Sequence, residues 1–174
     1  MSDPGSAAAL VAGPTDLAAR LVAELTRRGQ TVATCESITG GLIGASLTEP
    51  PGASLAVRGG LVTYMTDLKT TLAGIPADLI AVHGVVSEAV AAAMAQAARR
   101  VCRADWGIGV TGVAGPGPAE GQPAGTVWLA VAGPTALSAR SLHLAGSRRQ
   151  VRRAVAFQAL VDLERALALA ADPA

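Results

Sequence analysis

Two residues near the middle of the chain are each the only one of their type. Lys69 is the only lysine, whereas the other thirteen basic residues are arginine, and Tyr64 is the only tyrosine. Arginine cannot lose its proton in a protein, but lysine does so when its surroundings lower its pKa. A lysine at position 69 is therefore consistent with a neutral amine that acts as a base, or with an ordinary surface lysine.

Ser37 is a candidate nucleophile for such a base, because a serine attacks only when a base removes its proton. We expect Ser37 to follow a short strand, at the carboxyl edge of a parallel sheet where ligands bind in open α/β folds. There the backbone N–H groups of Thr39, Gly40 and Gly41 would be unpaired and available to an anion or oxyanion. The alternative is that Ser37 only caps the next helix.

Other side chains offer competing or supporting chemistry. Tyr64 would hydrogen-bond both the serine and the amine, or would pack over the sheet edge. Cys35 is a rival nucleophile, but a free cysteine usually behaves as a small buried hydrophobe, and we favour that interpretation. Glu36 would bind a polar substrate group or brace the helix start. A base role for His83 or His143 is less well supported than capping or packing.

Two further stretches are candidates for substrate contact. Thr111 and Gly112 end a predicted strand before a loop rich in glycine and proline, so a structural turn and a substrate loop both remain open. Arg148 begins a cluster of four arginines in the first turns of the last predicted helix. Positive charge there opposes the helix dipole, so either an anion such as phosphate binds or the cluster is a solvated face.

Length and composition limit the possible classes of protein. The 174 residues suffice for one domain with its own core, over 15–174, after a flexible tail over 1–14. A net charge of +1 does not favour a nucleic-acid or membrane partner. Two cysteines, Cys35 and Cys102, form neither a disulfide framework nor a spaced metal site. We therefore expect a cytoplasmic protein without a metal or cofactor.

The predicted strands and helices define a fold class. Strands are expected at 31–36, 57–64, 106–113, 125–131 and 137–144, with helices before, between and after them. The early alternation of strands and helices predicts a parallel sheet. The last three strands lack a crossover helix, and parallel neighbours need a crossover of about a dozen residues. We therefore predict a mixed, mostly parallel five-stranded sheet in which strand four is antiparallel, with helices on both faces.

These residues also resemble a known family, the CinA C-terminal domain family, from about Asp16 to about Leu167. The matching stretches are Thr34-Cys-Glu-Ser-Ile-Thr-Gly-Gly41, Arg58-Gly-Gly-Leu-Val-Thr-Tyr64, Lys69, His83-Gly-Val-Val-Ser-Glu88, Thr111-Gly-Val-Ala-Gly-Pro116 and Gly125-Thr-Val-Trp128. Cys35 replaces an alanine of many relatives, and Ser147 stands where relatives commonly carry an acidic residue. The N-terminal domain of full-length CinA proteins is absent, so we expect a stand-alone form.

The resemblance implies a three-layer α/β/α sandwich, a homo-oligomer and an amidohydrolase. The implied reaction converts the small-molecule pyridine nucleotide nicotinamide mononucleotide into nicotinate mononucleotide and ammonia through a serine acyl-enzyme. Ser37 would be the nucleophile, Lys69 the base and Tyr64 an assisting group. The candidate substrate-binding residues are Glu36, Thr39, Gly40, Gly41, Thr111, Gly112 and Arg148. The same loops and arginines would equally serve a nucleotide-binding module without catalytic activity.

Overall fold

A computed structural model describes residues 14–170 of the chain. The expected flexible tail lies outside the described residues apart from Pro14, where the first helix begins. In chain order the elements are α1 (Pro14–Arg27), β1 (Val32–Glu36), α2 (Leu42–Thr48), the 3-10 helix η1 (Ala53–Leu55), β2 (Val57–Val62), α3 (Thr66–Thr71), α4 (Ala77–His83), α5 (Glu88–Cys102), β3 (Trp106–Gly112), β4 (Thr126–Ala132), β5 (Leu137–His143) and α6 (Arg148–Leu169).

The five strands form one mixed sheet in the order β2-β1-β3-β4-β5. β1 is parallel to both β2 and β3, whereas β4 is antiparallel to both β3 and β5. The prediction of a mostly parallel sheet with an antiparallel fourth strand is therefore confirmed. The physical reason is the missing crossover helix after β3, because a chain that turns straight back can only pair antiparallel.

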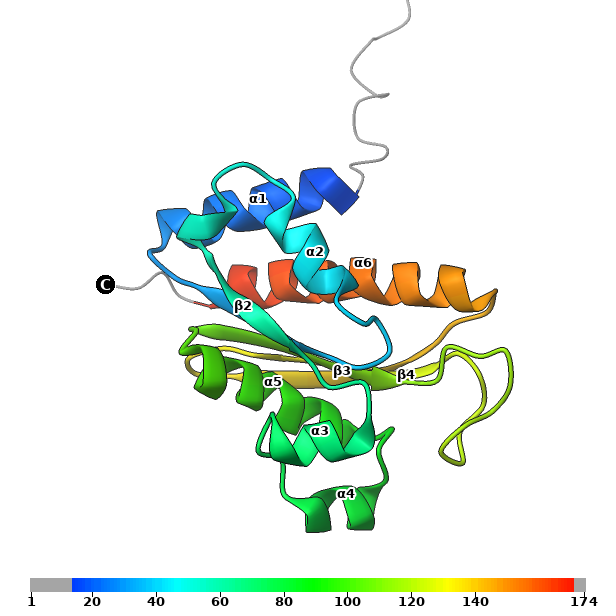
Figure 1. Cartoon of the computed structure of the whole chain (residues 1–174). Helices are drawn as coiled ribbons and strands as arrows, with labels where there is room; N and C mark the ends of the chain where they lie inside the picture. Colours follow the sequence, from blue (N-terminus) through cyan, green and yellow to red (C-terminus); the bar gives the residue numbers. More distant parts are fainter. Residues whose placement is uncertain (1–13, 171–174) are drawn as a thin grey trace, which may run out of the picture.

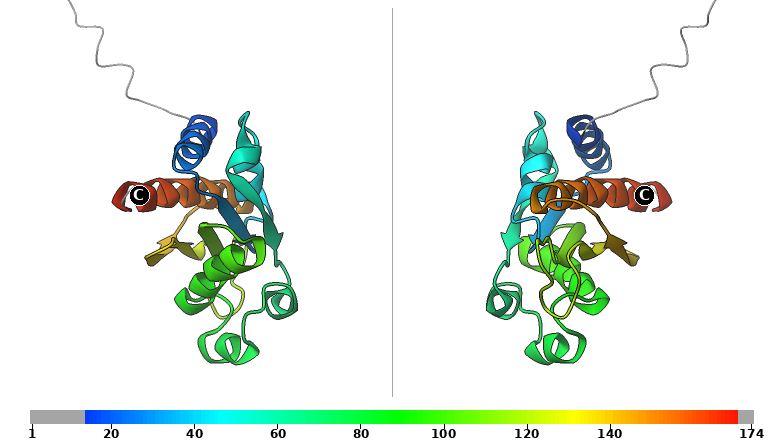
Figure 2. Two further views of the ribbon diagram at one scale, coloured as in Figure 1. Left: turned by 90° about the vertical axis from the view of Figure 1, so that its left-hand side faces the viewer. Right: turned by 90° about the vertical axis from the view of Figure 1, so that its right-hand side faces the viewer.

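Helices cover both faces of the sheet, so the structure has three layers, as Figure 1 shows. α1, α2 and α6 lie on one face, and α3, α4 and α5 lie on the other; the side views in Figure 2 show the same separation. The apolar stripe of α1, Leu17, Leu21 and Leu25, is buried in the core of the first face. None of the helices within residues 14–170 is long and apolar enough to cross a membrane.

The long helix α5 packs unusually close to β3 because both surfaces carry small residues. A methyl group added at Gly109 would overlap the backbone of Ala91 and Ala95, and one added at Gly107 would overlap the carbonyl of Ala95. A side chain at either glycine would therefore push the helix away from the sheet. This contact holds β3 in place, and β3 lies beside β1, which leads into the candidate site.

We expect Gly109→Ala to destabilise the protein by about 1–3 kcal/mol, because backbone atoms of α5 cannot move aside as a side chain can. Gly117→Ala is the matched control, since a methyl group there meets no atom within 4 Å. Denaturant unfolding of both variants would measure the free energy of unfolding. Equal stabilities for the two variants would contradict the close packing described here.

Candidate active site

A cavity of about 160 Å³ opens beyond the carboxyl ends of β1 and β3. It is lined by Ser37, Ile38, Tyr64, Thr66, Lys69, Val85, Val86, Thr111, Gly112, Ala114, Glu120 and Arg148. These residues come from the end of β3, from the loops after β1, β2 and β3, from the segment between α4 and α5, from α3 and from the first turn of α6. Residues far apart in the sequence therefore meet at the sheet edge that the strand pattern predicts for a ligand.

Ser37 and Lys69 lie in contact within this cavity. Lys69 Nζ lies 3.1 Å from Ser37 Oγ and donates a hydrogen bond to the carbonyl oxygen of Thr63 at 2.8 Å. Lys69 is completely buried, and Ser37 is only 8% exposed. The interpretation of Lys69 as an ordinary surface lysine is therefore wrong. An uncharged amine in this position would donate to Thr63 and accept the hydroxyl proton of Ser37.

The surroundings of Lys69 favour that uncharged form. Burial is the main influence and lowers the pKa of the Lys69 amine, because a charge loses its hydration in the interior. Burial also raises the pKa of the Cys35 thiol to about 11, so Cys35 remains protonated near neutral pH. A protonated thiol is a poor nucleophile, and Cys35 is completely buried beside Thr63. The rival thiol interpretation is correspondingly weak.

Glu36 braces the start of α2 instead of facing the cavity. One of its carboxylate oxygens accepts hydrogen bonds from the amides of Gly41 and Ile43, and the other accepts one from Gly44. The amide of Gly40 donates to the carbonyl of Ser37. The prediction of unpaired amides at Gly40 and Gly41 is therefore wrong, because the Ser37 carbonyl and the Glu36 carboxylate already accept their hydrogen bonds. Of the two roles considered for Glu36, the structure shows the bracing one.

Tyr64 lies at the rim of the cavity and contacts an arginine. Arg148 Nη2 donates a hydrogen bond to the Tyr64 hydroxyl at 2.6 Å, while Arg148 Nη1 donates to the carbonyl of Gly115 at 3.2 Å. The tyrosine side chain is 52% exposed. Within residues 14–170 the Tyr64 hydroxyl forms no hydrogen bond to Ser37 or Lys69, so the predicted bridge between them is not present. Tyr64 and Arg148 instead form one side of the cavity mouth.

The remaining predicted residues have mixed placements. Thr111 and Gly112 line the cavity, and the Thr111 hydroxyl donates to the carbonyl of Val85. Thr39 is completely buried and does not line the cavity, and its hydroxyl has no hydrogen-bond partner in the structure. Arg152 donates to the carbonyls of Ile38 and Thr39, so it holds the loop that carries Ser37.

Sequence reasoning missed three contributors to the site. The carbonyl of Thr63 carries no side-chain signal, and Glu120 lies in a loop whose path the sequence does not reveal. Arg152 was noticed only as one member of an arginine cluster, with no sign that it contacts the loop after β1. Among residues 14–170 no three His, Cys, Asp or Glu side chains lie close enough together to hold a metal ion.

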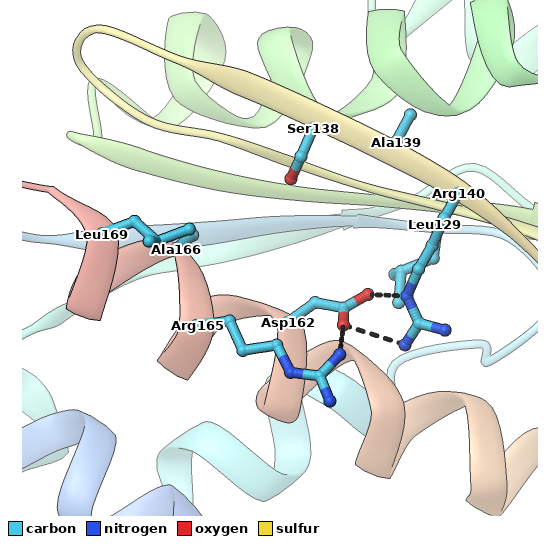
Figure 3. A pocket seen from close by; sticks show the side chains of 8 residues that line it. All are labelled: Leu129, Ser138, Ala139, Arg140, Asp162, Arg165, Ala166 and Leu169. Carbon is cyan, nitrogen blue, oxygen red and sulfur yellow. Dashed lines mark hydrogen bonds and ion pairs between the residues drawn. The ribbon is translucent and has the colours of Figure 1, made fainter.

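A larger cavity, of about 230 Å³, lies between the strands β4 and β5 and the helix α6. Figure 3 shows its main polar feature, an ion pair between Arg140 and Asp162, with Arg165 beside the same carboxylate. Arg140 also donates to Gln158. The residues that line this cavity include no lysine or histidine that would activate Ser138, so it is a weaker candidate for catalysis.

Comparisons with known proteins identify the family. The model of the CinA C-terminal domain matches residues 14–167. A CinA-like protein from Anaeromyxobacter sp. (strain Fw109-5) is 46% identical over 153 residues, which cover 87% of this chain and 37% of that protein. A CinA-like protein from Gemmatimonas aurantiaca is 45% identical over 157 residues, covering 90% and 37% of the two chains. The chain thus spans little more than a third of the length of these curated relatives.

Solved structures agree along nearly their whole length. The competence/damage inducible protein CihA from Agrobacterium tumefaciens superposes with a TM-score of 0.84 at 35% identity, covering 91% of this chain and 98% of that one. A CinA superfamily protein from Klebsiella pneumoniae 700603 gives 0.86 at 30% identity, covering 90% and 98%. Sequence and structure together show that this chain belongs to the CinA C-terminal domain family.

Proposed function

We propose that the protein is an amidohydrolase that removes ammonia from the carboxamide of nicotinamide mononucleotide. The observation that carries this proposal is the contact between a buried amine, Lys69, and the hydroxyl of Ser37 inside a cavity. Desolvation is one of the known means by which proteins turn a lysine into a base at neutral pH. A nucleophile in hydrogen-bond contact with such a base is the arrangement that acyl transfer requires.

In the first step Ser37 Oγ attacks the carboxamide carbon while uncharged Lys69 takes the hydroxyl proton. The carbon becomes tetrahedral and its oxygen becomes an oxyanion. Lys69, now an ammonium, then gives the proton to the departing nitrogen, and ammonia leaves. An ester between Ser37 and the nicotinate group remains. Water repeats the sequence with Lys69 as base, which frees nicotinate mononucleotide and restores the serine.

The amide of Gly112 is the best-placed donor for the oxyanion. In the antiparallel ladder of β3 and β4, the amide of Val113 donates to Thr126. Amides alternate in direction along such a ladder. That of Thr111 therefore points to β4, and that of Gly112 points to the side of β1, where Ser37 lies. Losing one oxyanion donor typically costs about 10²–10³-fold in rate, so this amide would be a major contributor.

The size and charge of the cavity fit a nucleotide bound by its ring. A volume of about 160 Å³ is roughly half the lower limit for sites that enclose a drug-sized ligand. The cavity therefore accommodates the carboxamide ring, while the ribose and phosphate extend over the rim. There Arg148 and the exposed Arg149 and Arg153 offer positive charge. A phosphate would also relieve the repulsion between these arginines and the dipole of α6.

We expect Ser37→Ala and Lys69→Arg each to abolish ammonia release from nicotinamide mononucleotide while the protein stays folded. Arginine is permanently protonated, so it cannot accept the proton of the serine. An ammonia assay measures the activity, and circular dichroism checks the fold. Near-normal turnover in Lys69→Arg would exclude lysine as the base. Tight binding without product in the unmodified protein would instead favour a nucleotide-binding module.

The activity is expected to rise with pH as Lys69 loses its proton. Because burial lowers the pKa of this amine below its usual 10.5, the rise in kcat/KM should be centred below 10.5 and follow a single deprotonation. Folding stability shifts in the same direction. Because the unfolded chain binds the lysine proton more tightly than the folded protein does, the free energy of unfolding rises with pH between the folded pKa and 10.5. Burial of Lys69 therefore destabilises the protein most below the folded pKa and least above pH 10.5.

The pH effect is checked against Lys69→Met, which has no proton to lose. The free energy of unfolding of the unmodified protein, measured relative to Lys69→Met, should increase between the folded pKa and 10.5. A kcat/KM that falls with rising pH over this window, or a stability difference independent of pH, would show that the amine is not held in its uncharged form.

Glu36→Gln tests whether the brace of α2 positions Ser37. Glutamine offers one acceptor oxygen where the carboxylate uses two, so at least one helix amide loses its partner. We expect a loss of about 1–3 kcal/mol in stability and a lower kcat with little change in KM. Glu49→Gln, at an exposed carboxylate, is the control and should change stability by less than about 0.5 kcal/mol. Unchanged kcat in Glu36→Gln would rule out a positioning role.

A further inference from the structure

Three basic or acidic side chains line the cavity, and within residues 14–170 one of them has no hydrogen-bond or ion-pair partner. Lys69 contacts Ser37 and Thr63, and Arg148 contacts Tyr64 and Gly115. The third, Glu120, forms no hydrogen bond or ion pair within the part of the chain that the structure describes. A carboxylate left unpaired at a cavity that also holds a nucleophile and a base is available to a positive charge on a ligand.

The backbone holds Glu120 in place through a tight turn. Ala119 and Gln122 exchange two backbone hydrogen bonds, of 3.1 and 2.9 Å. The two residues between them, Glu120 and Gly121, both have positive φ angles, 52° and 70°. This is the pattern of the two-residue hairpin turns in which both central residues are left-handed. Glycine, asparagine and aspartate usually occupy such positions, so glutamate here is unusual and suggests a use for its side chain.

We propose that Glu120 makes the cavity selective for a carboxamide whose ring carries a positive charge, over the same compound with a neutral ring. This inference rests on the proposed function, which places the carboxamide at Ser37. The ring of nicotinamide mononucleotide is a pyridinium, and its charge lies within the ring that the small cavity holds. In the reduced form of the same nucleotide the ring is neutral, while the carboxamide, ribose and phosphate are unchanged.

Glu120 also acts on Lys69, and this links recognition to reactivity. Two neighbours, Cys35 and Glu120, raise the pKa of Lys69 when they are ionised and so oppose the effect of burial. Cys35 stays protonated near neutral pH because its own pKa is about 11, which leaves Glu120 as the active influence. A positive ring beside Glu120 offsets the carboxylate and so favours the uncharged amine. A neutral ring leaves the carboxylate uncompensated.

Arg148 does not substitute for this role, although it faces the same cavity. Its guanidinium is positive, so it favours the phosphate of either nucleotide and repels the pyridinium ring of the oxidised form. Of the basic and acidic side chains that line the cavity, the carboxylate is therefore the one that favours the oxidised form. A hydrophobic or hydrogen-bonding contact would bind both rings similarly, because their shapes and their carboxamides are nearly the same.

The test measures binding in the Ser37→Ala background, where no turnover interferes. The dissociation constants of nicotinamide mononucleotide and of its reduced form are determined by titration calorimetry, with and without Glu120→Gln. We expect Glu120→Gln to weaken binding of the oxidised nucleotide about three- to tenfold and to leave the reduced one unchanged, with the difference shrinking at high salt. Glu120→Asp should retain part of the preference, and Glu49→Gln should retain all of it.

Each outcome decides the inference separately from the amidase proposal. Equal weakening of both nucleotides, or no change in either, would overturn selection by charge. Ammonia release by the unmodified protein together with an unchanged preference in Glu120→Gln would leave the amidase standing and reject the role of Glu120. A changed preference in Glu120→Gln without any ammonia release by the unmodified protein would support the role of Glu120 and reject the amidase. Failure of both nucleotides to bind would overturn both.

Discussion

The candidate site depends on one interaction, the contact of a fully buried amine with a serine hydroxyl and a single backbone carbonyl. An ammonium ion in water donates hydrogen bonds with all three of its protons. In the cavity the Lys69 amine contacts only two oxygen atoms among the described residues, the Ser37 hydroxyl and the Thr63 carbonyl. Burial without a full set of acceptors disfavours the charged form. The position of the Thr63 carbonyl is itself set by the sheet, because the amide of Thr63 donates to the carbonyl of Glu36. The parallel pairing of β1 and β2 therefore extends into the site.

The sheet topology explains why distant segments meet at one edge. β1, β2 and β3 are parallel, so the residues that follow them share the carboxyl edge. β3 returns through β4 without a crossover, which keeps the loop over 113–125, and Glu120 with it, at that edge. β5 then runs in the direction of β3, so α6 and Arg148 begin at the same place. One antiparallel strand thus brings two charged groups to the cavity.

The loop after β1 illustrates how structural and chemical roles are divided between adjacent residues. Glu36 accepts three helix amides, which compensates for an N-cap at Gly41 that has no side chain to offer. The side chain of its neighbour Ser37 is therefore not needed to cap α2, and it lines the cavity. Arg152 holds the next two carbonyls from the other side. Ser37 is thus positioned by two charged residues, Glu36 and Arg152, that do not themselves line the cavity.

The sequence by itself determined which segments form strands, the antiparallel direction of the fourth strand and the helices on both faces, because periodicity and a missing crossover are local properties. It named Ser37 and Lys69 as candidates, but only the fold decided that these residues, 32 positions apart, lie in contact. It could not determine which amides are already occupied or where Tyr64 points. Those depend on contacts such as Glu36 with Gly41 and Arg148 with Tyr64, the latter between residues 84 positions apart. It also could not place Glu120, since a loop rich in glycine and proline has no periodicity. Only the folded chain decided these points, because hydrogen-bond competition and burial are settled by neighbours in space.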